Sequence, residues 1–362
     1  MRNSPLHHKH LERSAKMADF GGWLMPIEYP DSGVLAEHAA VRERVGLFDV
    51  SHLGKATVSG PGSLDFLNAQ FTNDLHRISD GKAQYTLLCT ESGGVIDDLI
   101  VYRNSETDFF LIPNAANTSA VVAALLQAAP PTIKVANIHH DYGVLALQGP
   151  QSQAVLRALG VNPEMDYMAF SHVQIAGCDV ILCRTGYTGE HGYELVPHTS
   201  DCEKVWDALV LAMAPFDGLV CGLGARDTLR TEMGYPLHGH ELTLDITPVQ
   251  ASASWAIGWK KDGFAGHQVL RAQRESKNFR SLKALVLTDR GIPRAGMKVL
   301  SADGTEIGIV TSGTFSPTLK NGIALALIES NYGVGAEVFI DIRNRTSAAK
   351  VSELPLVPSH VR

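Results

Sequence analysis

Residues 93–102 read GGVIDDLIVY, an apolar β-strand that follows a glycine turn and carries two adjacent carboxylates, Asp97 and Asp98. Because successive strand residues point to opposite faces, one aspartate must lie on each side of the sheet. In a strand this apolar, at least one side belongs to the core, where a carboxylate is costly unless it is paired or used. The alternative is an edge strand with both acids in water.

The segments around this strand alternate between strands and helices. Upstream, residues 1–50 are expected to be helical with loops, with one amphipathic helix over 33–45. Residues 51–141 show the order β, α, β, β, β, α, which predicts a mixed sheet with helices on one face. The predicted strands are 55–59, 85–90, 95–102 and 109–113, and the predicted helices are 63–71 and 117–129.

Two more blocks follow. The second begins near Tyr142 with a buried strand and a helix, and continues to about Met213. The third begins after Arg280, where short apolar runs at close intervals predict a small all-β barrel or sandwich. These runs are 283–287, 297–300, 308–311, 323–328 and 337–342. The charged stretch 260–278 is interpreted as the linker into the third block.

Composition excludes several classes of protein. The 362 residues include 31 basic and 38 acidic side chains, and the net charge of −7 argues against a nucleic-acid partner or a polybasic membrane anchor. No run of 18 apolar residues occurs, and the N-terminus lacks the apolar region of a secretory signal. Five cysteines without a Cys-x-x-Cys pair argue against a disulfide framework or a zinc site and fit a cytoplasmic protein. Five histidines are expected to be exposed, in a spacing unsuited to a metal: His7, His8, His10, His139 and His140.

A second chemically unusual segment is RTGYTGEHGYE, residues 184–194. Its glycines allow the backbone to approach a ligand closely, and its tyrosines offer aromatic faces. Glu190 or Glu194 could accept paired N–H donors from a flat heterocycle. The alternative is a glycine-rich hairpin with ordinary surface charges.

A third segment is GARDTLRTEMG, residues 224–234. Arg226 and Arg230 are four residues apart on a predicted helix, so they share one face and could bind carboxylates as planar forks. The alternative is a surface turn in which Asp227 and Glu232 pair with the two arginines.

Taken in order, these segments resemble the aminomethyltransferase, or T-protein, family of the glycine cleavage system. The likeness covers nearly the whole chain, from MADFGGWLMPI at 17–27 and DVSH at 49–52 to SP at 316–317. It implies an α+β fold with three domains in a clover-like ring around a central folate channel. Residues 1–50 and 142–260 would form a discontinuous first, folate-binding domain with an antiparallel sheet. Residues 51–141 would form a ferredoxin-like domain, and residues 280–362 a C-terminal β-barrel.

The resemblance also implies the reaction. An aminomethyl group carried on the dihydrolipoyl arm of a lipoylated carrier, the H-protein, would pass its one-carbon unit to tetrahydrofolate. The products would be 5,10-methylenetetrahydrofolate, ammonia and the reduced carrier. Tetrahydrofolate is thus the implied co-substrate and the H-protein the implied partner, with no metal, nucleic acid or membrane.

Residues that match the family's motifs receive roles from the resemblance. Glu194 matches the acid that holds the pterin, with Glu190 as the nearby alternative, and Arg226 matches a folate-contacting arginine. The residues expected to pack on the folate rings or line the channel are Tyr85, Tyr102, Tyr187 and Leu53. Asp98, rather than Asp97, matches the catalytic acid, which would orient the folate nitrogens and help move a proton as ammonia departs.

Two alternative functions remain open. One is a folate-dependent demethylase of a small methylated amine or sulfonium compound, against which the tandem aspartates and the close N-terminal match argue. The other is a non-catalytic folate-binding protein, whose relatives carry a Lys-Gly-Cys motif, whereas residues 262–268 here contain no cysteine. Eukaryotic members of the family also place a tyrosine of the C-terminal tail against folate. The tail here has none, so either that contact is absent or His360 replaces it.

Overall fold

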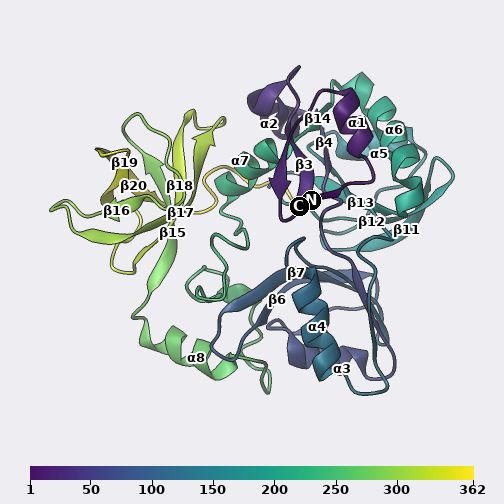
Figure 1. The fold of residues 1–362 in the computed structure, drawn as a ribbon, viewed down its shortest axis with the longest axis horizontal. Helices are drawn as coiled ribbons and strands as arrows, with labels where there is room; N and C mark the ends of the chain where they lie inside the picture. Colours follow the sequence, from purple (N-terminus) through teal and green to yellow (C-terminus); the bar gives the residue numbers. More distant parts are fainter.

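The computed structural model describes all residues from Met1 to Arg362 and arranges them as three lobes around a common centre (Figure 1). The first lobe is built on a six-stranded sheet in the order β11-β12-β13-β10-β4-β14. Neighbouring strands are antiparallel except for the parallel pair β4–β14 at one edge. Its strands are β4 (Gly46–Asp49), β10 (Leu145–Gln148), β11 (Phe170–Ile175), β12 (Cys178–Cys183), β13 (Gly192–Pro197) and β14 (Leu219–Cys221). The chain therefore enters this sheet once, leaves it, and returns about 100 residues later.

Helices and a small sheet complete the first lobe. The helices are α1 (His7–Glu12), α2 (Gly33–Glu43), α5 (Ser152–Ala158), α6 (Cys202–Met213) and α7 (Leu223–Met233), with 3-10 turns η2 (Thr199–Asp201) and η3 (Ala214–Phe216). Contrary to the expectation of helices and loops before residue 50, a three-stranded sheet is formed by β1 (Arg2–Asn3), β2 (Lys16–Phe20) and β3 (Trp23–Glu28). Gly21 and Gly22 both have positive φ and turn β2 into β3, which the apolar pattern alone did not reveal.

The second lobe contains the strand that carries the two aspartates. Its five-stranded sheet has the order β6-β7-β8-β5-β9. Because β7 pairs with a neighbour on each side, the edge-strand alternative is excluded. The elements are β5 (Ala56–Ser59), α3 (Ser63–Gln70), η1 (Leu75–Arg77), β6 (Lys82–Cys89), β7 (Val95–Ser105), β8 (Asp108–Ile112), α4 (Thr118–Ala128) and β9 (Lys134–Asn137). Figure 1 shows α3 and α4 beside this sheet.

The third lobe is a closed six-stranded barrel, which confirms the barrel expectation. Its strands are β15 (Arg280–Leu287), β16 (Lys298–Leu300), β17 (Glu306–Ser316), β18 (Asn321–Glu329), β19 (Glu337–Ile342) and β20 (Arg345–Ser352). The last strand was missed because its sequence is small and polar. In the barrel every second residue of this strand is buried, namely Ser347, Ala349 and Val351. The strand therefore has the expected two-residue period, but its buried side chains are too small to be recognised as an apolar run.

A helix occupies part of the predicted linker between the second and third blocks. It is α8 (His267–Ser276), and η4 (Ser254–Ala256) precedes it. Leu270 of α8 is fully buried in a cluster with Leu87 and Val95 of the second lobe. Apart from His267 and Leu270, the residues of α8 are exposed or half-buried, so the stretch resembled a solvated connection although one face is anchored.

Two of the five histidines expected at the surface are buried instead. His10 is fully buried, and its Nε2 lies 2.8 Å from Oδ2 of Asp49, while its Nδ1 lies 2.9 Å from the Tyr29 hydroxyl. Although burial opposes it, the hydrogen bond and charge of His10 lower the pKa of Asp49 to about 2. His139 is buried beside Trp23. The local pattern could not show this, because their partners are distant in the sequence.

Lys55 is a buried cation between the first two lobes. Its ammonium group donates to the backbone oxygens of Ser51, at 2.7 Å, and of His139, at 3.3 Å. Burial lowers the pKa of Lys55 to about 7. An unfolded lysine keeps its proton up to about pH 10.4. Between these two pH values the unfolded chain therefore binds more protons than the folded chain, and stability rises with pH.

We therefore expect the pH dependence of stability to change in Lys55→Met. The unmutated protein should gain stability relative to this variant between pH 7 and 9, by up to about 1.4 kcal/mol per pH unit. Below pH 7 the difference between the two proteins should level off. Urea unfolding of both proteins at pH 6, 7, 8 and 9 measures this difference, and parallel curves across that range would contradict the burial argument.

Candidate functional site

The two aspartates of β7 have different surroundings. Asp97 is fully buried and accepts hydrogen bonds from the backbone N–H of Asn114, from its side-chain amide, and from the side-chain amide of Asn117, at 2.7–2.9 Å. Asp98 is half-buried and accepts one from the Tyr85 hydroxyl and one from the Asn114 amide, both at 2.9 Å. Asn114 thus bridges the pair, and only Asp98 faces Tyr85.

Both carboxyl groups are shifted towards their protonated forms. Burial raises the pKa of Asp98, and the hydrogen bond from Tyr85 partly opposes this shift. Burial and the adjacent charge of Asp98 raise the pKa of Asp97 well above its ordinary value. A carboxyl group with a raised pKa exchanges its proton nearer to neutral pH, which is what general acid–base catalysis requires.

The two candidate glutamates also differ in what they bind. Glu190 is buried, and its Oε1 accepts from Arg42 at 3.0 Å while its Oε2 accepts from His360 at 2.9 Å. Glu194, on β13, is buried, and its Oε2 accepts from the Thr185 hydroxyl at 2.5 Å. Its Oε1 accepts no hydrogen bond within the chain. Glu194 therefore keeps acceptor capacity for a ligand, whereas each carboxylate oxygen of Glu190 already has a side-chain partner.

The two arginines of α7 share a face but not a role. The guanidinium of Arg226 lies 4.7 Å from the centre of the Tyr187 ring, and its Nη1 is buried without a hydrogen-bond partner. Arg230 is almost fully buried and paired with Asp227 and Glu241. Arg226 is therefore the arginine that can still bind a ligand, while Arg230 joins elements of the fold. Of the alternative reading as a surface turn, the pairing with Asp227 is seen at Arg230, whereas Glu232 binds Arg42 instead.

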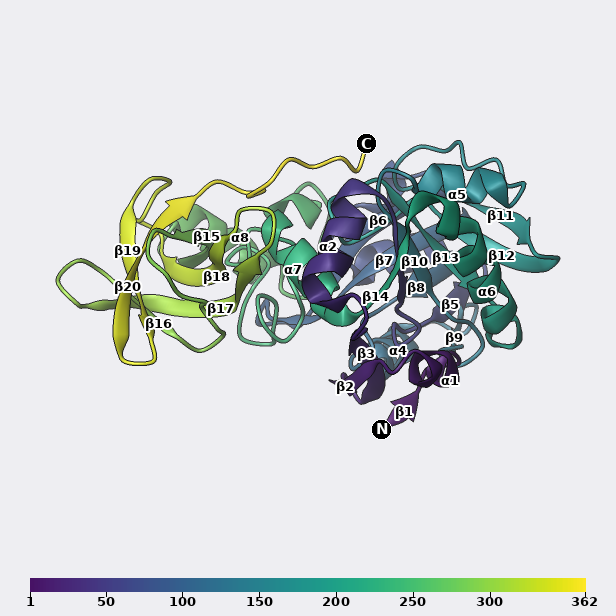
Figure 2. The same ribbon diagram turned by 90° about the horizontal axis from the view of Figure 1, so that it is seen from above.

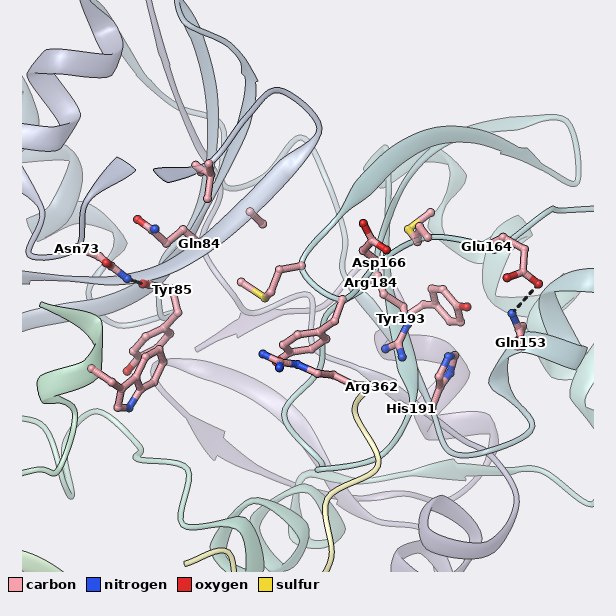
Figure 3. A pocket seen from close by; sticks show the side chains of 16 residues that line it. Asn73, Gln84, Tyr85, Gln153, Glu164, Asp166, Arg184, His191, Tyr193 and Arg362 are labelled. Carbon is pink, nitrogen blue, oxygen red and sulfur yellow. Dashed lines mark hydrogen bonds between the residues drawn. The ribbon is translucent and has the colours of Figure 1, made fainter. Parts of the chain in front are cut away.

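Two cavities are lined by some of these residues, although neither Glu190 nor Glu194 lines them. The larger has a volume of about 770 Å³, and Figure 3 shows Tyr85 on one side of it and Arg184, Tyr193 and Arg362 on the other. Tyr85 is stacked on the exposed ring of Trp255 at 5.2 Å, which forms an aromatic wall. The smaller cavity, of about 380 Å³, is lined by Tyr187 and Arg226, among others. Asp98 lines neither cavity. Its carboxylate is linked to the larger cavity by the hydrogen bond from Tyr85, which lines that cavity.

The other expected ring contacts are placed differently. Tyr187 is half-buried, and its hydroxyl donates to the backbone oxygen of Pro236 at 2.5 Å. Leu53 is half-buried at the edge of the core that contains Tyr102. Tyr102 itself is fully buried and lines neither cavity, so its ring cannot stack on a ligand there. Its hydroxyl lies 3.4 Å from that of Thr185, which makes it a support for Glu194.

Several residues of the site were not identified from the sequence. Asn114 follows β8, and no local pattern distinguishes it from a turn residue. Tyr167 lines the larger cavity from a loop and Trp255 from the short 3-10 turn η4, and neither segment shows a periodic pattern. Arg184 and Thr185 lie inside the glycine-rich segment, but nothing in the sequence pattern identified them as residues of the site. Arg362 reaches the cavity from the far end of the chain.

Three further observations concern sites of other kinds. No three side chains of His, Cys, Asp or Glu come together in a way that could hold a metal ion. All five cysteines are buried and unpaired. None of the helices combines the length and the apolar character needed to cross a membrane.

Comparisons with known proteins agree along the whole chain. Residues 6–261 match the model of the GCVT N-terminal domain, and residues 280–358 match that of the glycine cleavage T-protein C-terminal barrel domain. The chain is 54% identical to the aminomethyltransferase of Parafrankia sp. (strain EAN1pec), covering 100% of this chain and 99% of that one. It is also 54% identical to that of Mycobacterium tuberculosis (strain ATCC 25618 / H37Rv), covering 99% and 98%. The crystal structure of the glycine cleavage system aminomethyltransferase T from Bartonella henselae superposes with a TM-score of 0.93 at 33% identity, over 99% of each chain.

Proposed function

The chain belongs to the aminomethyltransferase family of the glycine cleavage system, and on that basis we propose that it transfers a one-carbon unit to tetrahydrofolate. The donor is an aminomethyl group on the dihydrolipoyl arm of a lipoylated carrier protein, the H-protein. The products are 5,10-methylenetetrahydrofolate, ammonia and the reduced carrier. The five unpaired, buried cysteines support a cytoplasmic location for this reaction.

The buried Glu194, together with residues that line the two cavities, fits a reduced folate. A pterin presents adjacent N–H donors along one edge, and the free Oε1 of Glu194 together with its Oε2 can accept two of them. The unpartnered Nη1 of Arg226 is a buried donor that an oxygen or carboxylate of the ligand would satisfy. This orphaned donor is the observation that most directly supports a ligand here. The stacked Tyr85 and Trp255 offer an aromatic wall for the flat rings.

In this proposal Asp98 is the catalytic residue. When bound, tetrahydrofolate supplies the nucleophilic nitrogen for the one-carbon unit. Burial raises the pKa of Asp98, which suits this carboxyl group to donate or accept a proton as ammonia departs. Tyr85 and Asn114 each donate a hydrogen bond to one of its two oxygens, so the carboxyl group is held in a defined position. Asp97, which the asparagines enclose, anchors the start of α4.

The proposal is tested by the dependence of ammonia release on the carrier. Purified protein supplied with tetrahydrofolate and an aminomethyl-loaded, lipoylated carrier protein should release ammonia and form 5,10-methylenetetrahydrofolate in equal amounts. Omission of either substrate should stop both. Folate-dependent turnover of a free methylated amine or sulfonium compound, without a carrier, would instead identify a demethylase. Folate binding without either activity would identify a non-catalytic protein.

A further inference from the structure

The last residues of the chain return from the barrel to the larger cavity. Figure 2 shows the C-terminal segment running from β20 across the molecule towards the first lobe. Along this path the backbone N–H of Leu356 donates to the backbone oxygen of Glu232 at 2.8 Å. The N–H of His360 donates to the oxygen of Gly189 at 2.7 Å. Residues 354–362, here called the tail, have no regular secondary structure, so such contacts determine where they lie.

The side chains of Glu190 and Arg184 fasten the end of the tail. The Nδ1 of His360 donates to Oε2 of Glu190 at 2.9 Å, and Nη2 of Arg184 donates to the backbone oxygen of Val361 at 2.7 Å. Glu190 is itself held by Arg42, which also binds Glu232. The proposed mechanism uses none of these bonds. The carboxylate of Glu190 is buried, yet it binds the exposed imidazole of His360. This hydrogen bond is explained if its role is to hold the tail in place.

What the tail places at the cavity is Arg362. This side chain lines the larger cavity, with its guanidinium 5.9 Å from the centre of the Tyr167 ring. Figure 3 shows it beside Arg184, opposite Tyr85. His360 itself does not line this cavity.

We propose that Glu190 and His360 form a latch that positions Arg362 as the cation for the anionic end of the folate, a role that rests on the proposed function. A reduced folate ends in a glutamate whose carboxylates are negatively charged, and a guanidinium binds carboxylates well. When the latch is open, the side chain of Arg362 occupies many positions. The apparent affinity for folate is then reduced in proportion to the fraction of molecules in which Arg362 lies at the cavity. Glu190 and His360 are thus positioning residues, and their loss affects folate binding rather than the chemical step.

The latch is tested first on the exposed partner. His360→Ala leaves Glu190 paired with Arg42, so the fold is retained. We expect the dissociation constant and KM for tetrahydrofolate to rise about threefold to tenfold, with kcat unchanged. Arg362→Gln should produce at least the same rise. Since the histidine acts through the arginine, the double variant should bind no more weakly than Arg362→Gln alone.

A second readout needs no folate. Hydrogen exchange of the tail amides should be faster in His360→Ala and Glu190→Gln than in the unmutated protein, because the N–H of His360 loses its protected position. A matched control is Glu203→Gln, which removes a carboxylate that also contacts a histidine and a cationic side chain, His8 and Lys9, outside the tail. This control should change neither exchange in the tail nor folate affinity.

The outcomes separate the latch from the proposed function. If the unmutated protein does not bind tetrahydrofolate, the proposed function fails, while the exchange data still report on the latch. If the unmutated protein binds it but His360→Ala binds equally tightly, or the effects of His360→Ala and Arg362→Gln add, the latch is overturned. Unchanged tail exchange in both latch variants would overturn it as well.

Discussion

Asp98→Asn should lower turnover by about 10²–10⁴-fold while tetrahydrofolate binds nearly as before, because asparagine has the shape of the carboxylate but cannot carry its proton. The hydrogen bonds around residue 98 can be kept in this variant. The new amide oxygen can accept from Asn114, and the new amide NH₂ can donate to the Tyr85 hydroxyl, which rotates to accept. The loss is therefore expected in kcat. It is measured by ammonia release at saturating carrier, beside the dissociation constant of tetrahydrofolate.

Asp97→Asn is the matched control, since it makes the same chemical change one residue away. Asp97 is enclosed by Asn114 and Asn117, and burial already raises its pKa well above the ordinary value. We expect a loss of stability of about 1–3 kcal/mol and a much smaller loss of turnover. Ammonia release by Asp98→Asn at the unmutated rate would show that the assignment is wrong. A larger loss of turnover in Asp97→Asn would move the catalytic role to its neighbour.

The strand that carries these aspartates shows how far sequence reasoning reaches. An apolar run with two carboxylates predicts a strand whose acids face opposite sides, since this follows from the two-residue period alone. The position of β7 inside the sheet results from its pairing with β6 and β8. The two-residue period of a strand does not determine which other strands it pairs with. The barrel was predictable because its strands are apolar and short, except β20, whose small residues gave no such signal.

The parts of the site that were not predicted come from distant segments. Glu190 and Glu194 lie four residues apart in one glycine-rich segment, and both remained candidates for the pterin. Their difference arises from Arg42 and His360, one near each end of the chain. Trp255, on the short 3-10 turn η4, and Arg362, in the tail, likewise reach the larger cavity from distant parts of the chain. Such contacts depend on how the lobes pack, and no period or spacing encodes that.

Glu194→Ala should weaken tetrahydrofolate binding by at least about 100-fold, the largest effect on affinity that we expect from any single change. The variant removes two charge-assisted hydrogen bonds to the pterin edge, each worth about 1.5–3 kcal/mol. Glu194→Gln should lose less, because one oxygen can still accept. Glu194 lies on β13, and within the folded protein the change removes only the hydrogen bond from the Thr185 hydroxyl. Equilibrium binding of tetrahydrofolate, monitored by the change in tryptophan fluorescence, measures both variants.

The two glutamates can then be separated by their coupling to Arg362. If Glu194 binds the pterin directly, its effect is independent of the tail, so the losses in Glu194→Ala and Arg362→Gln should add in free energy. Glu190 acts through His360 and the tail, so the loss in Glu190→Gln should disappear when Arg362 is already replaced. The reverse pattern, with an additive loss at Glu190 and little effect at Glu194, would assign the pterin to Glu190. It would also remove the reason for treating the hydrogen bond between Glu190 and His360 as a latch.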